Sequence, residues 1–160
     1  MQILVLYYSK GGNTHKLAKE IAQGVDSIEG VESVLKKTDE VSKDDFVNAS
    51  GVIAGSPVYF GLMAAQLKQI FDDYVGVRKK MEGKVGAAFA TSADPSGGKE
   101  TTMLGILQAL LIYGMVVVGD PLAATGHYGT SCVGAPDQGT AKNGRKLGQR
   151  VAELALKLHS

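Results

Sequence analysis

The clearest chemical signature in the chain is a short polar segment near its start. It follows an unbroken apolar run at 3–8, precedes a helical pattern over 17–28, and consists of Ser9, Lys10, Gly11, Gly12, Asn13 and Thr14. Glycine lets a backbone wrap closely, hydroxyls donate hydrogen bonds, and the start of a helix favours negative charge. We therefore expect this segment to bind a phosphate group, the alternative being a capped turn without a ligand.

Two widespread phosphate-binding loops are excluded. The chain contains no Gly-x-x-x-x-Gly-Lys-Ser/Thr, so it is not a P-loop nucleotidase. It also contains no Gly-x-Gly-x-x-Gly, and Asp39 lies too far along the chain to bind the ribose of a dinucleotide.

Two later segments share the placement of the first one, after an apolar strand-like run. One carries two neighbouring aromatic rings and consists of Pro57, Val58, Tyr59, Phe60 and Gly61. The other combines hydroxyls with glycines and contains Thr91, Ser92, Ala93, Asp94, Gly97 and Gly98. Aromatic rings suit contact with a flat heterocycle, and glycines let backbone amides approach its edge. The alternatives are rings that pack into the core and a flexible surface loop.

The elements that would position these segments alternate along the whole chain. Strand-like runs at 3–8, 31–37, 50–56, 84–91 and 115–119 are separated by helical patterns. This order predicts an α/β fold, a three-layer α/β/α sandwich with a five-stranded parallel sheet, in one domain over residues 1–160. Ligands bind beyond the carboxyl ends of such strands, where the three segments would meet. Ser42, with Asp45 three residues on, predicts the start of a short helix.

The helix expected at 99–113 differs from the others because it is apolar almost all round. Such a helix is predicted to be buried on more than one side, by the sheet and by another subunit. Either a homodimer or a homotetramer would meet that requirement, although burial within one chain would also do so.

Bulk composition narrows the setting. The formal charge of +1 predicts neither nucleic-acid binding nor attraction to an anionic membrane, and no apolar run reaches transmembrane length. The single cysteine, Cys132, excludes an internal disulfide and fits a reducing compartment. The start of the chain lacks the pattern of a signal peptide, so we expect a cytoplasmic protein. The sequence contains no cluster of His, Asp or Glu residues with the spacing of metal ligands, so we expect no metal site.

Considered together, these motifs resemble the flavodoxin-like family, and within it the WrbA-type NAD(P)H:quinone oxidoreductases. The resemblance rests on an ordered set of segments, at 5–9, 55–61, 83–98, 114–118 and 127–130. It implies FMN as the cofactor, with its phosphate on residues 9–14, its ring beside residues 57–61 and its pyrimidine edge on residues 91–98. NAD(P)H would be the electron donor, and a quinone or a similar small molecule the acceptor.

The chain also departs from this resemblance. It is more compact after the third helix and before the final Tyr-Gly segment, so the family tetramer cannot be assumed. The family histidine before the fifth strand is replaced by Tyr113, which is either a ring contact or a core residue. His127 and Tyr128 are candidates for ring or substrate contact, and His127 is a weak candidate for proton transfer to the acceptor. A surface position is the alternative for His127.

Three functions remain open from the sequence. The first is an FMN-dependent oxidoreductase that passes electrons from NAD(P)H to a quinone. The second is a flavodoxin-type one-electron carrier, although 17 basic and 16 acidic residues give no strongly acidic docking surface. The third is a non-catalytic binding module that retains the fold.

Overall fold

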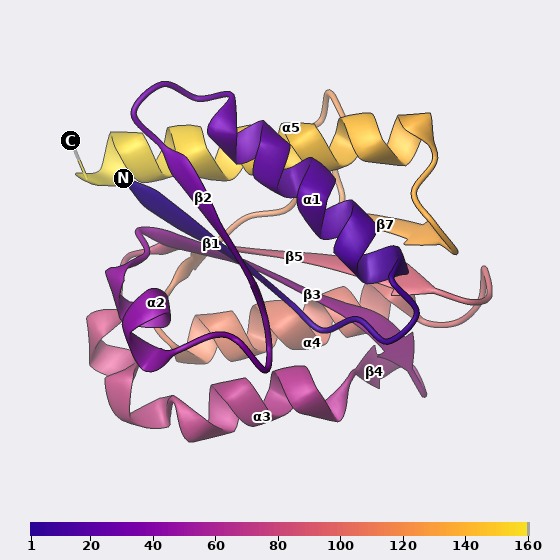
Figure 1. Ribbon diagram of the computed structural model, residues 1–160, viewed down its shortest axis with the longest axis horizontal. Coiled ribbons are helices and arrows are strands. Elements are labelled where there is room, and N and C mark those ends of the chain that lie inside the picture. The colour runs from indigo at the N-terminus through magenta and orange to yellow at the C-terminus, as the bar shows by residue number, and fades with distance from the viewer. Residues whose placement is uncertain (160) are drawn as a thin grey trace.

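The computed structural model describes residues 1–159 as a three-layer α/β/α sandwich (Figure 1). The strands are β1 (Gln2–Tyr7), β2 (Glu32–Lys37), β3 (Gly51–Tyr59), β4 (Leu62–Met63), β5 (Val85–Ser92), β6 (Val116–Val117) and β7 (Thr130–Val133). The helices are α1 (Asn13–Asp26), α2 (Lys43–Asn48), α3 (Ala65–Asp73), α4 (Lys99–Ile112) and α5 (Gln138–His159), with a 3₁₀ helix η1 (Val75–Lys80). None of the described helices is both long and apolar enough to span a bilayer.

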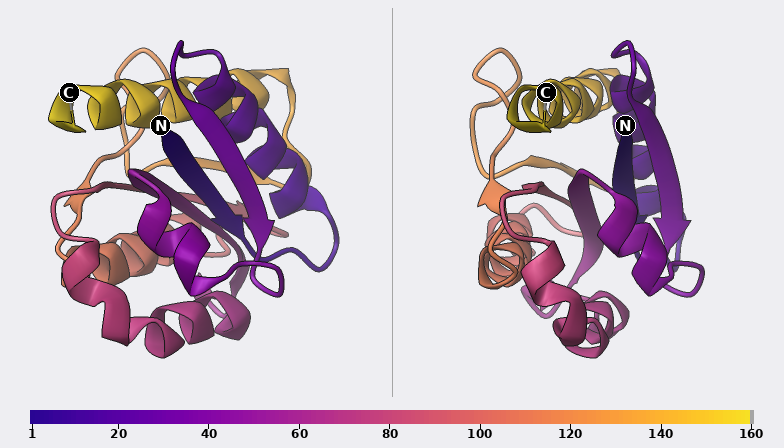
Figure 2. Two further views of the ribbon diagram at one scale, coloured as in Figure 1. Left: turned by 60° about the vertical axis from the view of Figure 1, so that its left-hand side comes forward. Right: turned by 90° about the vertical axis from the view of Figure 1, so that its left-hand side faces the viewer.

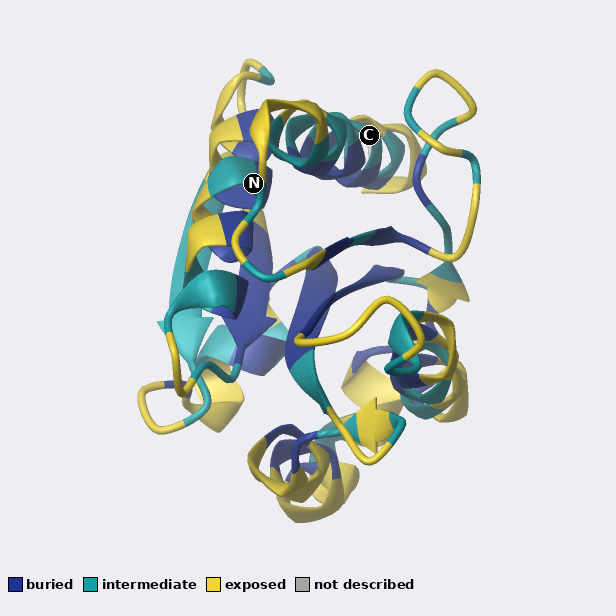
Figure 3. Ribbon diagram, turned by 90° about the vertical axis from the view of Figure 1, so that its right-hand side faces the viewer, coloured by how far each residue is buried: buried dark blue, intermediate teal, exposed yellow. Residues whose placement is uncertain are grey.

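The main sheet is parallel and runs in the order β2-β1-β3-β5-β6. Helices α1 and α5 cover one face, and α3 and α4 cover the other (Figures 1 and 2). Each face has its own core, and the strands between them are buried along most of their length (Figure 3). This confirms the predicted parallel-sheet sandwich, and continuous apolar strands suit a sheet covered on both sides.

The fifth strand is not the single run at 115–119 that the sequence predicts. It is split into β6, which pairs with the amino end of β5, and β7, which pairs with its carboxyl end. Residues 118–129 leave the sheet between the two halves. The buried carboxylate of Asp120 holds this excursion by accepting hydrogen bonds from the amides of Thr125 (3.0 Å) and His127 (2.8 Å). The sequence gives no sign of β7 because its four residues lie between glycines.

The third strand is longer than predicted and continues through Tyr59. Its last residues pair antiparallel with β4, which the sequence prediction missed, and Phe60 and Gly61 form the turn between them. Ser56 supports this hairpin, because its hydroxyl accepts a hydrogen bond from the amide of Ala64 at 2.8 Å. A two-residue strand is too short to produce a periodic pattern in the sequence.

Two predictions about helices have different outcomes. Ser42 does cap α2: its hydroxyl accepts from the amide of Asp45 at 3.1 Å, and the Asp45 carboxylate accepts from the amide of Ser42 at 2.9 Å. Within one chain, α4 is buried on one side only, so burial of its other side by another subunit stays a prediction. Leu111 and Ile112 on its outer side are 55% and 63% exposed.

Candidate functional site

The segment between β1 and α1 forms an open cradle of backbone amides. Gly12 precedes the helix with φ at +89°, in the left-handed region that favours glycine, and no side chain caps the helix start. In the part of the chain that the structure describes, the amides of Lys10, Gly11, Asn13 and Thr14 have no hydrogen-bond partner. Free amides at a helix start, reinforced by the helix dipole, form a site for an anion.

Ser9 fixes the shape of this cradle. Its hydroxyl oxygen accepts hydrogen bonds from the amides of Gly12 at 3.1 Å and His15 at 3.4 Å. Because the oxygen is the acceptor in both contacts, its own O–H remains available as a donor. The side chain therefore shapes the turn and adds a further donor to it.

Thr14 connects the first segment to the third. Its hydroxyl lies 2.8 Å from that of Thr91 at the end of β5, and both side chains are buried. One hydroxyl donates to the other, so one O–H of the pair remains free. This contact joins positions 77 residues apart and fixes the start of α1 against the carboxyl edge of the sheet.

The second and third segments also touch each other. A Cβ on Gly98 would lie 2.9 Å from the Cα of Gly61, so only glycine allows this approach. Thr101, in the first turn of α4, fixes the pair by donating to the carbonyl of Gly61 (2.6 Å) or Gly98 (3.0 Å). The sequence prediction missed Thr101, because a threonine in the first turn of a helix carries no distinctive signal.

The three segments enclose one cavity of about 230 Å³ at the carboxyl edge of the sheet, the edge that faces the viewer in Figure 3. Every residue that lines it is one that the sequence analysis singled out: Ser9, Lys10, Gly11, Asn13, Thr14, Pro57, Val58, Tyr59, Thr91, Ser92 and Ala93. Gly12, Phe60, Gly61, Asp94, Gly97 and Gly98 belong to the same segments but do not line the cavity. The structure thus brings the three predicted segments together, and the binding of a ligand by these residues stays a prediction.

One side of this cavity is formed by an uncharged aromatic side chain, and the free amides of the β1–α1 segment supply hydrogen-bond donors beside it. Tyr59 packs edge-on against Tyr8, with ring centroids 6.3 Å apart, and burial raises the pKa of Tyr59, so its hydroxyl stays protonated. A neighbouring hollow of about 220 Å³ contains His15 and Lys37, which the sequence prediction did not include. Burial, followed by the charge of Lys19, lowers the pKa of His15.

Phe60 has an unusual conformation at the tip of the β3–β4 turn. Among the described residues it is the only one besides glycines with a positive φ, at +52°, and its side chain is fully exposed at 106%. Exposure of a phenyl ring to water does not stabilise the fold. The left-handed conformation also costs a residue with a Cβ roughly 1–2 kcal/mol. Strained exposed residues concentrate where function maintains them.

The structure separates three other candidates from this cavity. Of the two alternatives for Tyr113, the structure agrees with the core residue: the side chain is 4% exposed, donates to the carbonyl of Phe71 at 2.7 Å and packs against Phe46. Burial raises the pKa of Tyr113 to about 12. His127 and Tyr128 line a different cavity, between α4 and the 118–129 excursion, so their contact with ring or substrate stays a prediction.

Cys132 is structural in this setting. It lies on β7 and is buried, and burial raises the pKa of its thiol to about 11. Among residues 1–159, no three His, Cys, Asp or Glu side chains gather in a way that could hold a metal ion.

The strand order and the amide cradle define a flavodoxin-like protein. The sequence profile of the NADPH-dependent FMN reductases matches residues 1–130, more than three quarters of the chain. The chain therefore belongs to the NADPH-dependent FMN reductase family.

Individual relatives carry two kinds of name. A protein named flavodoxin from Aquifex aeolicus is 38% identical, with 95% of this chain and 85% of that protein covered. An NAD(P)H dehydrogenase (quinone) from Archaeoglobus fulgidus is 34% identical, with 98% of both covered. The crystal structure of a WrbA-like flavodoxin from Agrobacterium tumefaciens superposes with a TM-score of 0.85 at 25% identity, covering 98% of each chain.

Proposed function

We propose that this protein is an FMN-dependent oxidoreductase that passes electrons from NAD(P)H to a quinone or a similar small acceptor. The observation that carries the proposal is the cradle of four unpartnered amides at the mouth of the three-segment cavity. Family membership and the quinone dehydrogenase relatives support the choice of chemistry.

The residues present fit the cofactor. The amides of residues 10–14, with the hydroxyls of Ser9 and Thr14, offer the donors that a phosphate dianion needs. The cavity of about 230 Å³ is below the range of roughly 300–1,000 Å³ common for small-molecule sites, so FMN would extend beyond it. The exposed rings of Tyr59 and Phe60 supply an apolar surface there.

Bound FMN supplies hydride and electron chemistry that no side chain provides. The chain itself would hold the phosphate through residues 9–14, border the ring with residues 57–61, and face its polar edge with residues 91–98. The contact of Gly61 with Gly98 keeps the last two segments at a fixed separation. Nothing in this arrangement requires a charged side chain at the ring.

A flavodoxin-type electron carrier is the second candidate, favoured by the relative of that name from Aquifex aeolicus. The near balance of 17 basic and 16 acidic residues disfavours it, because docking of a carrier to redox proteins usually relies on a field of one sign. We also propose a cytoplasmic location, which the single buried cysteine supports.

Turnover with NADH or NADPH distinguishes the oxidoreductase from the electron carrier. We expect FMN-loaded protein to oxidise NADH or NADPH, followed at 340 nm, in an amount equal to the benzoquinone reduced. Omission of the quinone in the absence of oxygen is the control, and it should stop oxidation after one equivalent of the bound FMN. A protein that binds FMN but consumes neither nucleotide would favour the carrier, and one that does not bind FMN would exclude both.

The conformation of Phe60 gives a separate prediction. Phe60→Gly should raise the unfolding free energy of the FMN-free protein by about 0.5 kcal/mol, because relief of the positive φ outweighs the extra chain entropy of glycine. The same change should weaken FMN binding roughly tenfold, since an aromatic contact is lost. Urea unfolding and fluorescence titration measure the two effects.

Phe60→Ala is the matched control, because it removes the ring but keeps the strained backbone. It should weaken FMN binding as much as Phe60→Gly without the gain in stability. Unchanged FMN affinity in both variants would place the flavin ring away from this turn.

A further inference from the structure

A second cavity lies beside the 118–129 excursion, along the edge strand β7, and we call it the excursion cavity. Its volume of about 320 Å³ falls in the range of roughly 300–1,000 Å³ that is common for small-molecule sites. The start of α4, the excursion, β7 and α5 all contribute to its walls. Most of the lining side chains are polar, among them Glu100, His127, Tyr128, Ser131 and Asn143.

The polar groups of the excursion cavity are not used by the protein itself. Within residues 1–159, these five side chains make no hydrogen bond and no ion pair. Thr130, which also lines the cavity, is 2% exposed, and its hydroxyl likewise has no partner among the described residues. Buried polar groups are normally hydrogen-bonded, to the protein or to something bound. The excursion cavity is therefore suited to a ligand rich in hydroxyl and other polar groups.

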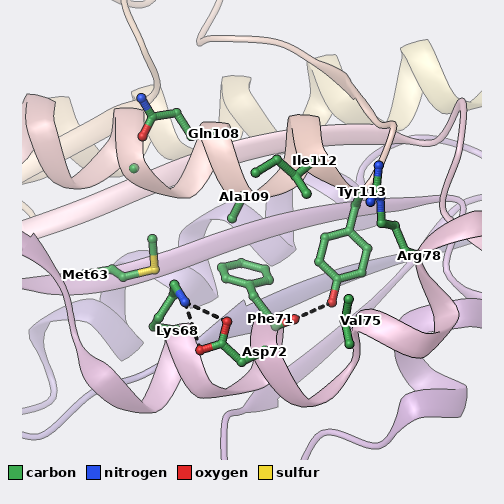
Figure 4. A pocket seen from close by; sticks show the side chains of 11 residues that line it. Met63, Lys68, Phe71, Asp72, Val75, Arg78, Gln108, Ala109, Ile112 and Tyr113 are labelled. Carbon is green, nitrogen blue, oxygen red and sulfur yellow. Dashed lines mark hydrogen bonds and ion pairs between the residues drawn. The ribbon is translucent and has the colours of Figure 1, made fainter.

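A larger cavity, of about 500 Å³, lies between α4 and the segment formed by α3 and η1, and it has a different character (Figure 4). Lys68 and Asp72 at its rim form an ion pair with each other. The hydroxyl of Tyr113 donates to the carbonyl of Phe71, and most of the other lining residues are apolar. Of the two cavities, the excursion cavity offers more free polar groups to a ligand.

The excursion cavity adjoins the segment at 91–98, which would face the polar edge of the flavin ring. On β7, Ser131 pairs with Ala90 of β5, one residue before that segment. On α4, Glu100 follows two residues after Gly98, the last residue of the segment. A nicotinamide must lie against the flavin ring to transfer hydride. The remainder of its dinucleotide would then extend beside the excursion cavity.

We propose that the excursion cavity binds the adenosine ribose of the pyridine nucleotide and that Glu100 selects NADH over NADPH. This inference rests on the oxidoreductase function proposed for the protein. In dinucleotide sites an acidic side chain accepts a hydrogen bond from the ribose 2′-hydroxyl of NAD, whereas an arginine accommodates the 2′-phosphate of NADP. Among the described residues, no lysine or arginine lines the excursion cavity. Lys99, next to Glu100 in the chain, and Arg150 on α5 each donate to a backbone carbonyl at 3.0 Å.

The alternative place for a 2′-phosphate is the hollow of about 220 Å³ beside the amide cradle. It is lined by Lys10, His15 and Lys37, but Lys37 already pairs with Asp39 at 3.1 Å. This hollow adjoins the segment that would hold the FMN phosphate, at the end of the cofactor away from the ring. It is therefore the less suitable place for a nucleotide whose nicotinamide lies on the ring.

Turnover of FMN-loaded protein with benzoquinone tests the selection. The wild type should have a kcat/KM for NADH about tenfold or more above that for NADPH, because a 2′-phosphate meets the carboxylate. Glu100→Gln should reduce this preference severalfold, and Glu100→Arg should reverse it. Glu153→Arg makes the same charge change at an exposed glutamate on α5, and this matched control should keep the wild-type ratio. FMN affinity should be unchanged in all three variants.

Binding of the oxidised nucleotides gives a readout that does not depend on turnover. By calorimetry, NAD⁺ should bind the FMN-loaded protein more tightly than NADP⁺, and the order should reverse in Glu100→Arg. Equal kcat/KM values for NADH and NADPH, or an unchanged ratio in Glu100→Arg, would overturn this inference and leave the proposed function standing. So would a preference for NADPH that Lys37→Ala removes. Oxidation of neither nucleotide would overturn the proposed function itself, and this inference with it.

Discussion

Combined substitution of Ser9→Ala and Thr14→Val should weaken FMN binding by roughly 150- to 25,000-fold. Ser9 and the Thr14–Thr91 pair each offer an O–H that the protein itself does not use. Loss of a hydrogen bond to a charged group costs about 1.5–3 kcal/mol, and two such losses give this range. Quenching of FMN fluorescence on titration with the protein measures the dissociation constant.

Two comparisons make this prediction specific to the phosphate. Thr102→Val is a matched control, because Thr102 is buried and its hydroxyl has no partner among the described residues. It should leave FMN affinity unchanged. Riboflavin lacks the phosphate, so the double variant and the wild type should bind it with similar affinity. An equal loss for riboflavin would mean that the substitutions act on the fold, and an unchanged FMN affinity would place the phosphate elsewhere.

Gly148→Ala should destabilise the protein by about 3 kcal/mol, even though alanine is the better helix former. A Cβ at position 148 on α5 would lie 2.1 Å from the carbonyl oxygen of Ile21 on α1. Gly24 makes the reciprocal contact, with a Cβ that would lie 2.0 Å from the carbonyl of Arg145. The two helices thus pack backbone against backbone, and a methyl group would force them apart, which costs about as much as overpacking of a core.

The matched control is Gly139→Ala in the first turn of the same helix. A Cβ there would meet only the Asp137 carboxylate at 3.5 Å, so the change should be neutral or stabilise the protein by up to about 1 kcal/mol. Urea unfolding followed by circular dichroism gives both values. Similar effects for the two variants would show that α1 and α5 do not pack as closely as described.

The sequence predicts the layers and the location of the site because both depend on local patterns. Uninterrupted apolar runs indicate strands covered on both faces, and a polar turn after each run identifies the carboxyl edge. All eleven residues that line the site cavity could therefore be named in advance. The resemblance to a known family then supplied the cofactor.

What the sequence could not give depends on contacts between distant residues. The hydroxyl pair of Thr14 and Thr91 and the clamp of Thr101 on Gly61 involve single side chains without a pattern. Two alternatives stayed open for Tyr113 because a tyrosine at a helix end looks the same whether its hydroxyl reaches a ligand or the carbonyl of Phe71. The short strands β4 and β7 were not predicted for the same reason, because pairing with neighbouring strands defines them more than the β-propensity of their residues does.

The split of the last strand has a consequence for how such proteins can diversify. Because β6 and β7 each pair with β5 independently, chain can be added or removed between them without disturbing either set of ladder bonds. The carboxylate of Asp120 closes the base of the 118–129 excursion, and Arg150 and Lys146 on α5 donate to the carbonyls of Asp120 and Ala123. We expect the fold to tolerate inserted peptides of about ten or more residues after the exposed Leu122. Insertions at this position could therefore give such a protein a new binding specificity, in evolution or by engineering.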